Sequence, residues 1–250
     1  MKINDIIERI EKEFPTELAY EWDNVGLLVG DREREVTNVV TCLDVTEEVM
    51  EFAKNADAQL IISHHPVLFS PINRINGDTK IGKLLMDAIE NKIAIYSAHT
   101  NCDKAEKGIN AKLSDMFELK DAEALEEDGL GRIGSLKAPM EFCEFAKFVE
   151  EKLSVKVRFC GDTKRVIKKV AICSGSGGDV VASAIEKGAD LLVTGDTKYH
   201  QMLDVKDEIN VIDAGHFGTE NIVTEIFAEI LCNMGVGVFW KDSEDVFKYL

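Results

Sequence analysis

The feature that most constrains the fold is a strand–helix–strand pattern that occurs twice along the chain. A run rich in β-branched residues at 39–44 is followed by a helical stretch and by a second apolar run at 60–63. An offset of 131 residues takes both runs, without a gap, to 170–175 and 191–194. Short apolar runs that alternate with helices are typical of parallel sheets with buried strands. The sequence therefore predicts an α/β fold made of two related lobes that arose by internal duplication.

The two copies also end alike. Each continues into a third apolar run, at 93–97 in the first copy and at 209–213 in the second, and then reaches a histidine. A carboxylate follows each histidine four residues later, in the pairs His99 with Asp103 and His216 with Glu220. Chance similarity between ordinary βαβ units is the alternative interpretation, but the matched endings favour duplication.

The boundary between the lobes is predicted in an acidic stretch at 121–129, which leads into glycines and reads as an exposed linker. The first lobe is expected to span residues 1–123 and the second residues 124–250. Within the second lobe, apolar spacings of three and four predict amphipathic helices at 141–153 and 219–232.

Composition narrows the classes of protein. The net charge of -17 repels phosphate backbones and disfavours general nucleic-acid binding. The six cysteines are scattered without a Cys-x-x-Cys pair, which argues against a zinc ribbon or a disulfide framework and favours a reducing compartment. No apolar run approaches the roughly 18–20 residues of a membrane span, and the N-terminal segment lacks the apolar region of a signal peptide. We expect a cytoplasmic protein with no membrane partner.

Histidines supply the strongest chemical signal. Four of the five histidines stand just beyond the C-terminal end of a predicted strand, where α/β sheets bind ligands: His64, His65, His99 and His216. Adjacent residues of an extended chain point in opposite directions, and Pro66 keeps His65 extended, so this pair could serve two metal ions. Carboxylates such as Asp103 and Glu220 can bridge such ions. A single histidine of this kind would be read as an ordinary polar residue, whereas the group indicates a metal site.

Two further segments are weaker candidates. In the stretch after the run at 191–194, Lys198 could neutralise a phosphate, Asp196 could accept a hydrogen bond from a base or ribose, and His200 could exchange protons. A polar turn is an equally good interpretation of that stretch. The glycine-rich loop at 173–178 lacks the spacing of known phosphate-binding loops and is better read as a tight turn. From its residues alone, the segment at 22–27 reads only as a turn.

These motifs together resemble the Nif-three-like family, catalogued in bacteria and archaea as GTP cyclohydrolase 1 type 2 homologs. The resemblance covers nearly the whole chain and is specific. Its anchors are Trp22 to Leu27, Ser63 to Pro66, Ala98 to Asp103, Gly129 to Gly134, Thr194 to His200, and Gly215-His216 with Thr219-Glu220.

The resemblance implies a ligand set and an assembly. Five residues would hold a dinuclear metal centre between the lobes: His64, His65, Asp103, His216 and Glu220. Of the two carboxylates, we expect Glu220 to be the bridge between the ions. It also implies subunits assembled into a toroidal homohexamer, and this chain would be the minimal form without an inserted domain. The two divalent ions could be zinc, iron, manganese or nickel, because such ligand sets accept all of them.

The resulting functional hypothesis is a metal-dependent hydrolase that acts on a nucleotide or related purine compound. His99 is the first candidate for a proton shuttle and His200 the second, with Asp196 and Lys198 as substrate contacts. One alternative is a toroidal protein that binds single-stranded or duplex DNA, with metals that are structural or contact phosphate. A second alternative is a metal-dependent phosphoesterase.

Overall fold

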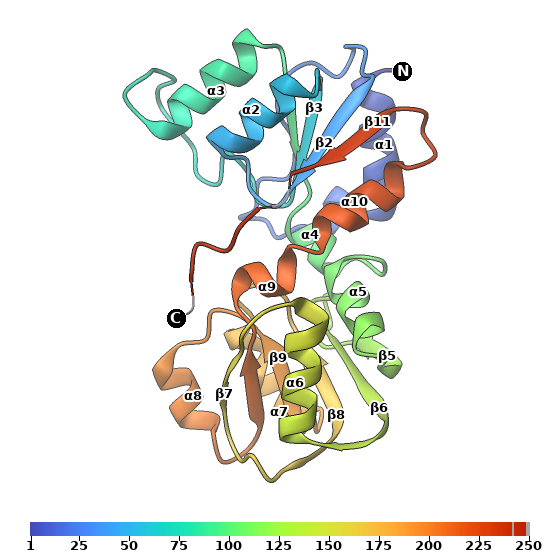
Figure 1. Ribbon diagram of the computed structural model, residues 1–250, viewed down its shortest axis with the longest axis vertical. Helices are drawn as coiled ribbons and strands as arrows, with labels where there is room; N and C mark the ends of the chain where they lie inside the picture. Colours follow the sequence, from blue (N-terminus) through green and yellow to red (C-terminus); the bar gives the residue numbers. More distant parts are fainter. Residues whose placement is uncertain (242, 249–250) are drawn as a thin grey trace. The chain divides into compact units, whose positions relative to one another are not determined.

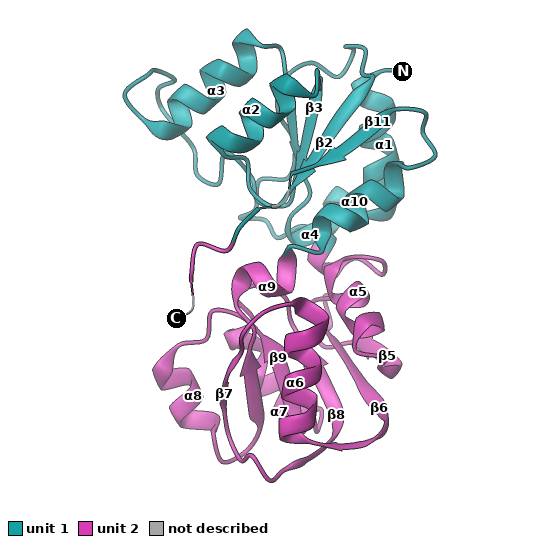
Figure 2. Cartoon of the chain, in the orientation of Figure 1, with its two compact units in different colours: residues 1–102, 221–244 teal, residues 103–220, 245–250 magenta. Residues whose placement is uncertain are grey.

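The computed structural model describes residues 1–241 and 243–248 and contains two compact units (Figure 2). Unit 1 consists of Met1–Cys102 and Asn221–Glu244, and unit 2 consists of Asp103–Glu220 with the C-terminal residues from Asp245. Each unit is built around one sheet. Within the described ranges, no helix is long and apolar enough to cross a membrane.

Unit 1 has a five-stranded sheet in the order β1-β4-β3-β2-β11 (Figure 1). Its centre is parallel and consists of β2 (Asn38–Cys42), β3 (Leu60–Ser63) and β4 (Ala94–Ser97). The strand β1 (Gly26–Val29) pairs antiparallel with β4, and β11 (Gly237–Trp240) pairs parallel with β2. The three central strands confirm the apolar runs predicted in the first copy.

Helices cover both faces of this sheet. The helices α2 (Glu47–Asn55) and α3 (Lys80–Glu90) share a buried core with alternate residues of β2, β3 and β4. Thr46 and Thr79 cap these helices through hydrogen bonds to backbone amides. Figure 1 shows α1 and α10 beside the same sheet, and Thr41 of β2 donates a hydrogen bond to the Thr224 carbonyl of α10. The ranges of these elements are Ile3–Glu13 for α1, Thr16–Leu18 for the short helix η1, and Val223–Leu231 for α10.

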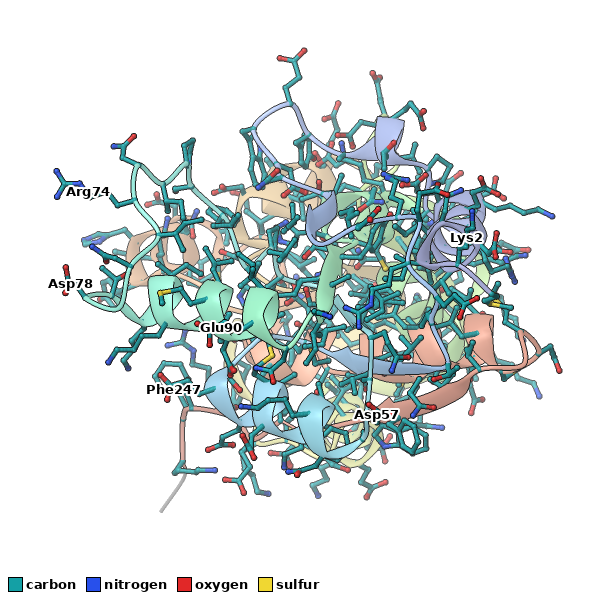
Figure 3. All side chains as sticks on the ribbon, turned by 90° about the horizontal axis from the view of Figure 1, so that it is seen from above. Lys2, Asp57, Arg74, Asp78, Glu90 and Phe247 are labelled. Atoms are coloured by element: carbon teal, nitrogen blue, oxygen red, sulfur yellow. The ribbon has the colours of Figure 1, made fainter. Side chains whose placement is uncertain are left out.

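A long loop connects β3 to α3. It runs from His64 to Thr79 without regular helix or strand. Figure 3 shows Arg74 and Asp78 on this loop with their side chains directed away from the sheet. Loops of this length without secondary structure are uncommon in compact domains and are often functional.

Unit 2 has a six-stranded sheet in the order β5-β6-β8-β9-β10-β7. Its centre is again parallel, where β8 pairs with β9 and β9 with β10. The strand ranges are Lys120–Ala124 for β5, Arg132–Glu141 for β6, Arg158–Cys160 for β7, Val166–Ile172 for β8, Leu191–Thr194 for β9 and Asn210–Asp213 for β10. The three parallel strands confirm the apolar runs of the second copy.

The helices of unit 2 pack on both faces of this sheet. Residues of α7 and α8 share a core with β8, β9 and β10, whereas α5 and α6 pack against β6 and β8. The predicted helix at 141–153 is confirmed as α6, and the one at 219–232 is divided into α9 in unit 2 and α10 in unit 1. The ranges are Ile109–Met116 for α5, Phe142–Leu153 for α6, Gly178–Val180 for η2, Val181–Glu186 for α7, Tyr199–Val205 for α8 and His216–Glu220 for α9. The short helix α4 (Thr100–Lys104) contains the division between the units, which falls after Cys102.

The registers of the two sheets correspond. Val39 pairs with Leu60 in unit 1, and Val170 pairs with Leu191 in unit 2, at the offset of 131 residues found in the sequence. In each unit the strand before the parallel set, β1 or β7, lies antiparallel at the far edge, beside β4 or β10. The last segments do not stay with their own copy, since α5 and β5 belong to unit 2, and α10 and β11 belong to unit 1.

Because of this exchange, the two units do not coincide with the predicted lobes 1–123 and 124–250. Residues 242, 249 and 250 of the second predicted lobe lie outside the described part of the chain. The structure divides after Cys102 and again after Glu220. The acidic stretch at 121–129 is not only a linker, because β5 occupies its first residues and hydrogen-bonds to β6, and Leu125 is fully buried. Backbone pairing with distant strands, which local composition does not report, fixes these boundaries.

Candidate metal centre

Three imidazoles of unit 1 lie together at the C-terminal edge of its sheet. His64 and His65 follow β3, and His99 follows β4, which is the parallel neighbour of β3. The ring centroids are 5.1 Å apart for His64 and His65, 5.0 Å for His64 and His99, and 5.6 Å for His65 and His99. One ring nitrogen from each lies within 4.8 Å of the others, so the three side chains could hold a metal ion. His99, predicted as a proton shuttle, is thus also a candidate ligand.

In each of these rings, Nδ1 forms a hydrogen bond with an oxygen atom. His64 Nδ1 lies 2.9 Å from the Ala98 carbonyl oxygen, and His65 Nδ1 lies 2.8 Å from Asp44 Oδ1. His99 Nδ1 lies 2.9 Å from Oδ1 of Asp23. Carbonyl and carboxylate oxygens only accept hydrogen bonds, so Nδ1 carries a proton, and in the neutral ring Nε2 then carries the lone pair. Histidines that ligate metals have this arrangement in most proteins.

Asp23 does more than orient His99. Its Oδ2 accepts hydrogen bonds from the Thr100 backbone amide at 3.0 Å and from the Thr100 hydroxyl at 2.5 Å. Burial alone would raise the pKa of Asp23, but the hydrogen bonds from His99 and Thr100 outweigh it and lower the pKa to about 2. The carboxylate is therefore charged near neutral pH. From its residues alone the segment at 22–27 indicates only a turn, so the role of Asp23 is not predicted, although Asp23 belongs to one of the motifs of the resemblance.

In unit 2, His216 and Glu220 lie on one face of α9. They are four residues apart, and His216 Nε2 lies 2.8 Å from Glu220 Oε2. The other ring nitrogen of His216, Nδ1, lies 2.8 Å from Asp196 Oδ2. The Glu220 side chain is buried, whereas His216 is about one-third exposed. This pair repeats the pattern of unit 1, with a ring oriented through Nδ1 by an oxygen.

The loop after β8 connects Asp103 and Glu220 within unit 2. The Ser174 hydroxyl donates to Asp103 Oδ1 at 3.2 Å. Gly175 has a positive φ of 60°, and a Cβ atom there would overlap Glu220 Oε1. Burial raises the pKa of the Cys173 thiol, and the negative charges of Asp103 and Glu220 raise it further. A small residue is required at Gly175 because the backbone passes directly beside the Glu220 carboxylate, so the loop is more than a generic tight turn.

The remaining predicted residues are placed differently. Lys198 and His200 are exposed at the start of α8, where the His200 ring contacts its neighbour Tyr199. Asp196, whose predicted contact with substrate stays a prediction, accepts a hydrogen bond from His216 Nδ1 and so orients that ring. The roles of Lys198 and His200 in substrate binding and proton transfer stay predictions.

Replacing Asp196 by alanine is expected to weaken metal binding by His216 by about 10–100-fold, because the imidazole loses the acceptor that fixes its orientation. Competition with a chromophoric chelator measures this affinity. Asp204→Ala provides a matched control, since Asp204 is an exposed acid of the neighbouring helix α8. An equal affinity in the two variants would contradict an orienting role for Asp196.

The similarity of the chain to known proteins extends over nearly its whole length. The family described as Duf34/NIF3 (NGG1p interacting factor 3) matches residues 1–244. A protein from Clostridium perfringens named GTP cyclohydrolase 1 type 2 homolog is 39% identical over 262 residues, and the alignment covers 100% of both chains. A protein of the same name from Lactococcus lactis is 35% identical over 257 residues, which cover 98% of this chain and 97% of the relative.

Solved structures share the fold. A Bacillus cereus protein related to NIF3 superposes with a TM-score of 0.94 at 25% identity, and the match covers 100% of this chain and 99% of that one. Reduced HcgD from Methanocaldococcus jannaschii superposes with a TM-score of 0.87 at 31% identity, over 97% of this chain and 98% of that one. The mixed α/β architecture with two sheets is therefore that of the NIF3 proteins.

Proposed function

Because the chain belongs to the Duf34/NIF3 family, we propose that it is a hydrolase that depends on two divalent metal ions and acts on a nucleotide or related purine compound. The name of the relatives, GTP cyclohydrolase 1 type 2 homolog, supports a purine nucleotide as the substrate class. The chemistry of the donor atoms in each unit supports metal binding.

The observation that carries this proposal is the state of the histidine rings. His64, His65, His99 and His216 all have Nδ1 within 2.9 Å of an oxygen acceptor. His200, the one remaining histidine, is exposed, and among the described residues its ring nitrogens have no such acceptor. Surface imidazoles gain little from a fixed tautomer, whereas a ligand needs one. The difference separates the four histidines with an oriented ring from His200, whose part in proton transfer stays a prediction.

The residues divide into roles by chemistry. His64 and His65 in unit 1, and Asp103, His216 and Glu220 in unit 2, would hold the ions. Divalent ions bound there would polarise the bond that is attacked and lower the pKa of coordinated water. His99 Nε2 would accept and return a proton, and Asp23 keeps the ring in the tautomer that this transfer needs. In unit 2, Asp196 orients the His216 ring for metal binding.

Metal content tests the ligand assignment. Replacing His65 or Glu220 by alanine is expected to remove at least half of the metal that copurifies with the protein, because each change deletes a donor atom. Elemental analysis of protein purified without chelators measures the ratio of metal to chain. His200→Ala is the matched control and should keep the wild-type ratio. Full metal occupancy in both ligand variants would overturn the assignment.

Product analysis tests the reaction. Incubation of the metal-loaded protein with GTP should release formate if the purine imidazole ring is opened, and the His65→Ala variant should release none. Release of inorganic phosphate without formate would instead identify a phosphoesterase. Turnover that persists after the metal is removed would contradict a metal-dependent hydrolase.

We also make proposals about the origin of the two units and about the oligomeric state of the chain. We infer that the two units descend from one duplicated α/β unit, which the shared strand order and the register offset of 131 residues support. We also propose the toroidal homohexamer, and light scattering would test it by giving six times the mass of 27.8 kDa.

A further inference from the structure

Exposed aromatic rings gather beside the imidazoles of unit 1. Trp22 is 59% exposed and Phe69 is 57% exposed, and their ring centroids are 5.9 Å apart. Both rings contact His99, with centroid distances of 6.2 Å for Trp22 and 6.1 Å for Phe69. Tyr20 stacks on Trp22 at 5.6 Å with an interplanar angle of 15° and so supports one face of the indole. Large aromatic side chains grouped at the surface commonly mark a binding site.

The backbone around these rings is fixed by polar contacts from the two residues after Trp22. Asp23 holds His99 and the amide that follows it. Asn24 donates from Nδ2 to the Leu68 carbonyl oxygen at 2.6 Å, directly before Phe69. Three consecutive residues therefore contribute a ring, an anchor for His99 and an anchor for Phe69. This arrangement explains the motif at 22–24 as a device that holds three rings together.

We infer that Trp22, Phe69 and His99 form a stacking platform for the base of a purine nucleotide. The inference rests on the proposed function and specifies how the substrate is recognised. A flat base can stack on the indole face that Tyr20 does not cover, and a two-ring base covers more of that face than a one-ring base. His99 Nε2, at the edge of the platform, can hydrogen-bond to a polar edge of the base.

The contacts favour a planar polar ligand over a purely apolar one. The three rings meet edge to face or tilted, which leaves ring faces rather than a closed apolar pocket. The platform also lies next to the rings of His64 and His65, whose centroids are 5.0 Å and 5.6 Å from that of His99, so a base that rests on the platform lies beside these two proposed ligands. An aliphatic ligand would leave the Nε2 group of His99 without a polar partner.

The test uses the intrinsic fluorescence of Trp22. The chain has two tryptophans, so Trp240→Phe leaves Trp22 as the reporter, and Trp240 is an exposed residue at the end of β11. Guanosine monophosphate should quench this fluorescence with saturation, whereas ribose 5-phosphate should not. In the same background, Phe69→Ala should raise the Kd for guanosine monophosphate by a factor of roughly 5–150, the range for loss of one stacked ring.

Control variants and a metal measurement separate the loss of base binding from misfolding and from the loss of metal. Phe69→Tyr retains an aromatic ring and should bind nearly as tightly as the parent. Phe159→Ala removes an equally exposed phenylalanine, at 51%, from unit 2 and should leave the Kd unchanged. The ratio of metal to chain should be unchanged in Phe69→Ala, so loss of base binding and loss of metal are separate readouts.

Each outcome decides the proposal. Equal affinity for ribose 5-phosphate, or an unchanged Kd in Phe69→Ala, would overturn the stacking platform even if the metal assignment holds. A change of oligomeric mass in Phe69→Ala without any base binding would show that the rings form an interface between copies of the chain, and would also overturn it. Base binding that persists after the metal is removed would support the platform, and formate release by the metal-loaded protein would test the proposed hydrolase separately.

Discussion

Replacing Phe227 by alanine is expected to lower the free energy of unfolding of unit 1 by about 3–5 kcal/mol, the usual cost of deleting a buried phenylalanine ring. Phe227 is fully buried in α10, and its ring packs edge to face on Phe14 with centroids 6.1 Å apart. The helix α10 comes from the second copy of the repeat but covers the sheet of unit 1. The variant therefore measures how strongly unit 1 depends on the segment that the two copies exchange.

Urea unfolding followed by circular dichroism measures this effect, with attention to two transitions because the chain has two compact units. Phe239→Ala is the control, since Phe239 lies in the same exchanged segment but is 40% exposed. Its loss should stay below about 1.5 kcal/mol, because less apolar surface is removed from the interior. Equal midpoints for Phe227→Ala and the parent would mean that α10 adds little to unit 1.

The central strands could be predicted because helices cover both faces of each sheet, so most residues of these strands are apolar. Strands of a covered parallel sheet are nearly continuous apolar runs, and those at 60–63 and 191–194 coincide with β3 and β9. The location of the candidate metal ligands could be predicted as well, because parallel strands place their C-terminal ends at one edge of the sheet. His64, His65 and His99 were found in this way and lie together.

The boundaries between units could not be predicted in the same way. The strand β11 has only four residues, and its pairing with β2 joins positions about 200 residues apart in sequence. The strand propensity of a four-residue segment does not indicate which distant strand it pairs with. The acidic composition at 121–129 resembled a linker, yet β5 forms there because β6 offers it an unpaired edge.

The acceptors around the histidines were missed for a related reason. Asp23, Asp44 and Asp196 are 76, 21 and 20 residues from the rings they bond. Aspartates in loops are common, and no spacing rule ties them to a histidine in another loop. The resemblance drew attention to Asp23 and Asp196 as members of motifs, but only the fold assigns each carboxylate to its ring.

Removing the carboxylate of Asp213 is expected to have the largest effect among the polar changes in unit 2. At the end of β10, Asp213 Oδ2 accepts hydrogen bonds from Arg158 Nε at 3.0 Å and Nη2 at 2.7 Å. The same oxygen accepts from the amide and hydroxyl of Thr197, and Oδ1 accepts from the Gly215 amide. One buried carboxylate thus connects three segments, including the residue before His216. Asp213→Ala should lower the free energy of unfolding by about 2–4 kcal/mol, since hydrogen bonds to a charged group contribute roughly 1.5–3 kcal/mol each and are not additive.

The stability that Asp213→Ala loses is expected to depend on pH. Burial alone would raise the pKa of Asp213, but the hydrogen bonds from Thr197, Arg158 and Gly215 outweigh it and hold the pKa below the ordinary value of 3.8. A carboxyl group with a lowered pKa in the folded state stabilises the protein fully above its unfolded pKa and loses that contribution as pH falls through the folded value. The difference in urea midpoint between the parent and Asp213→Ala should therefore be large at pH 7 and should shrink below about pH 4. Asp204→Ala, which removes an exposed acid, should match the parent at both pH values. A difference that stays constant down to pH 3 would mean that Asp213 acts through packing rather than through its charge.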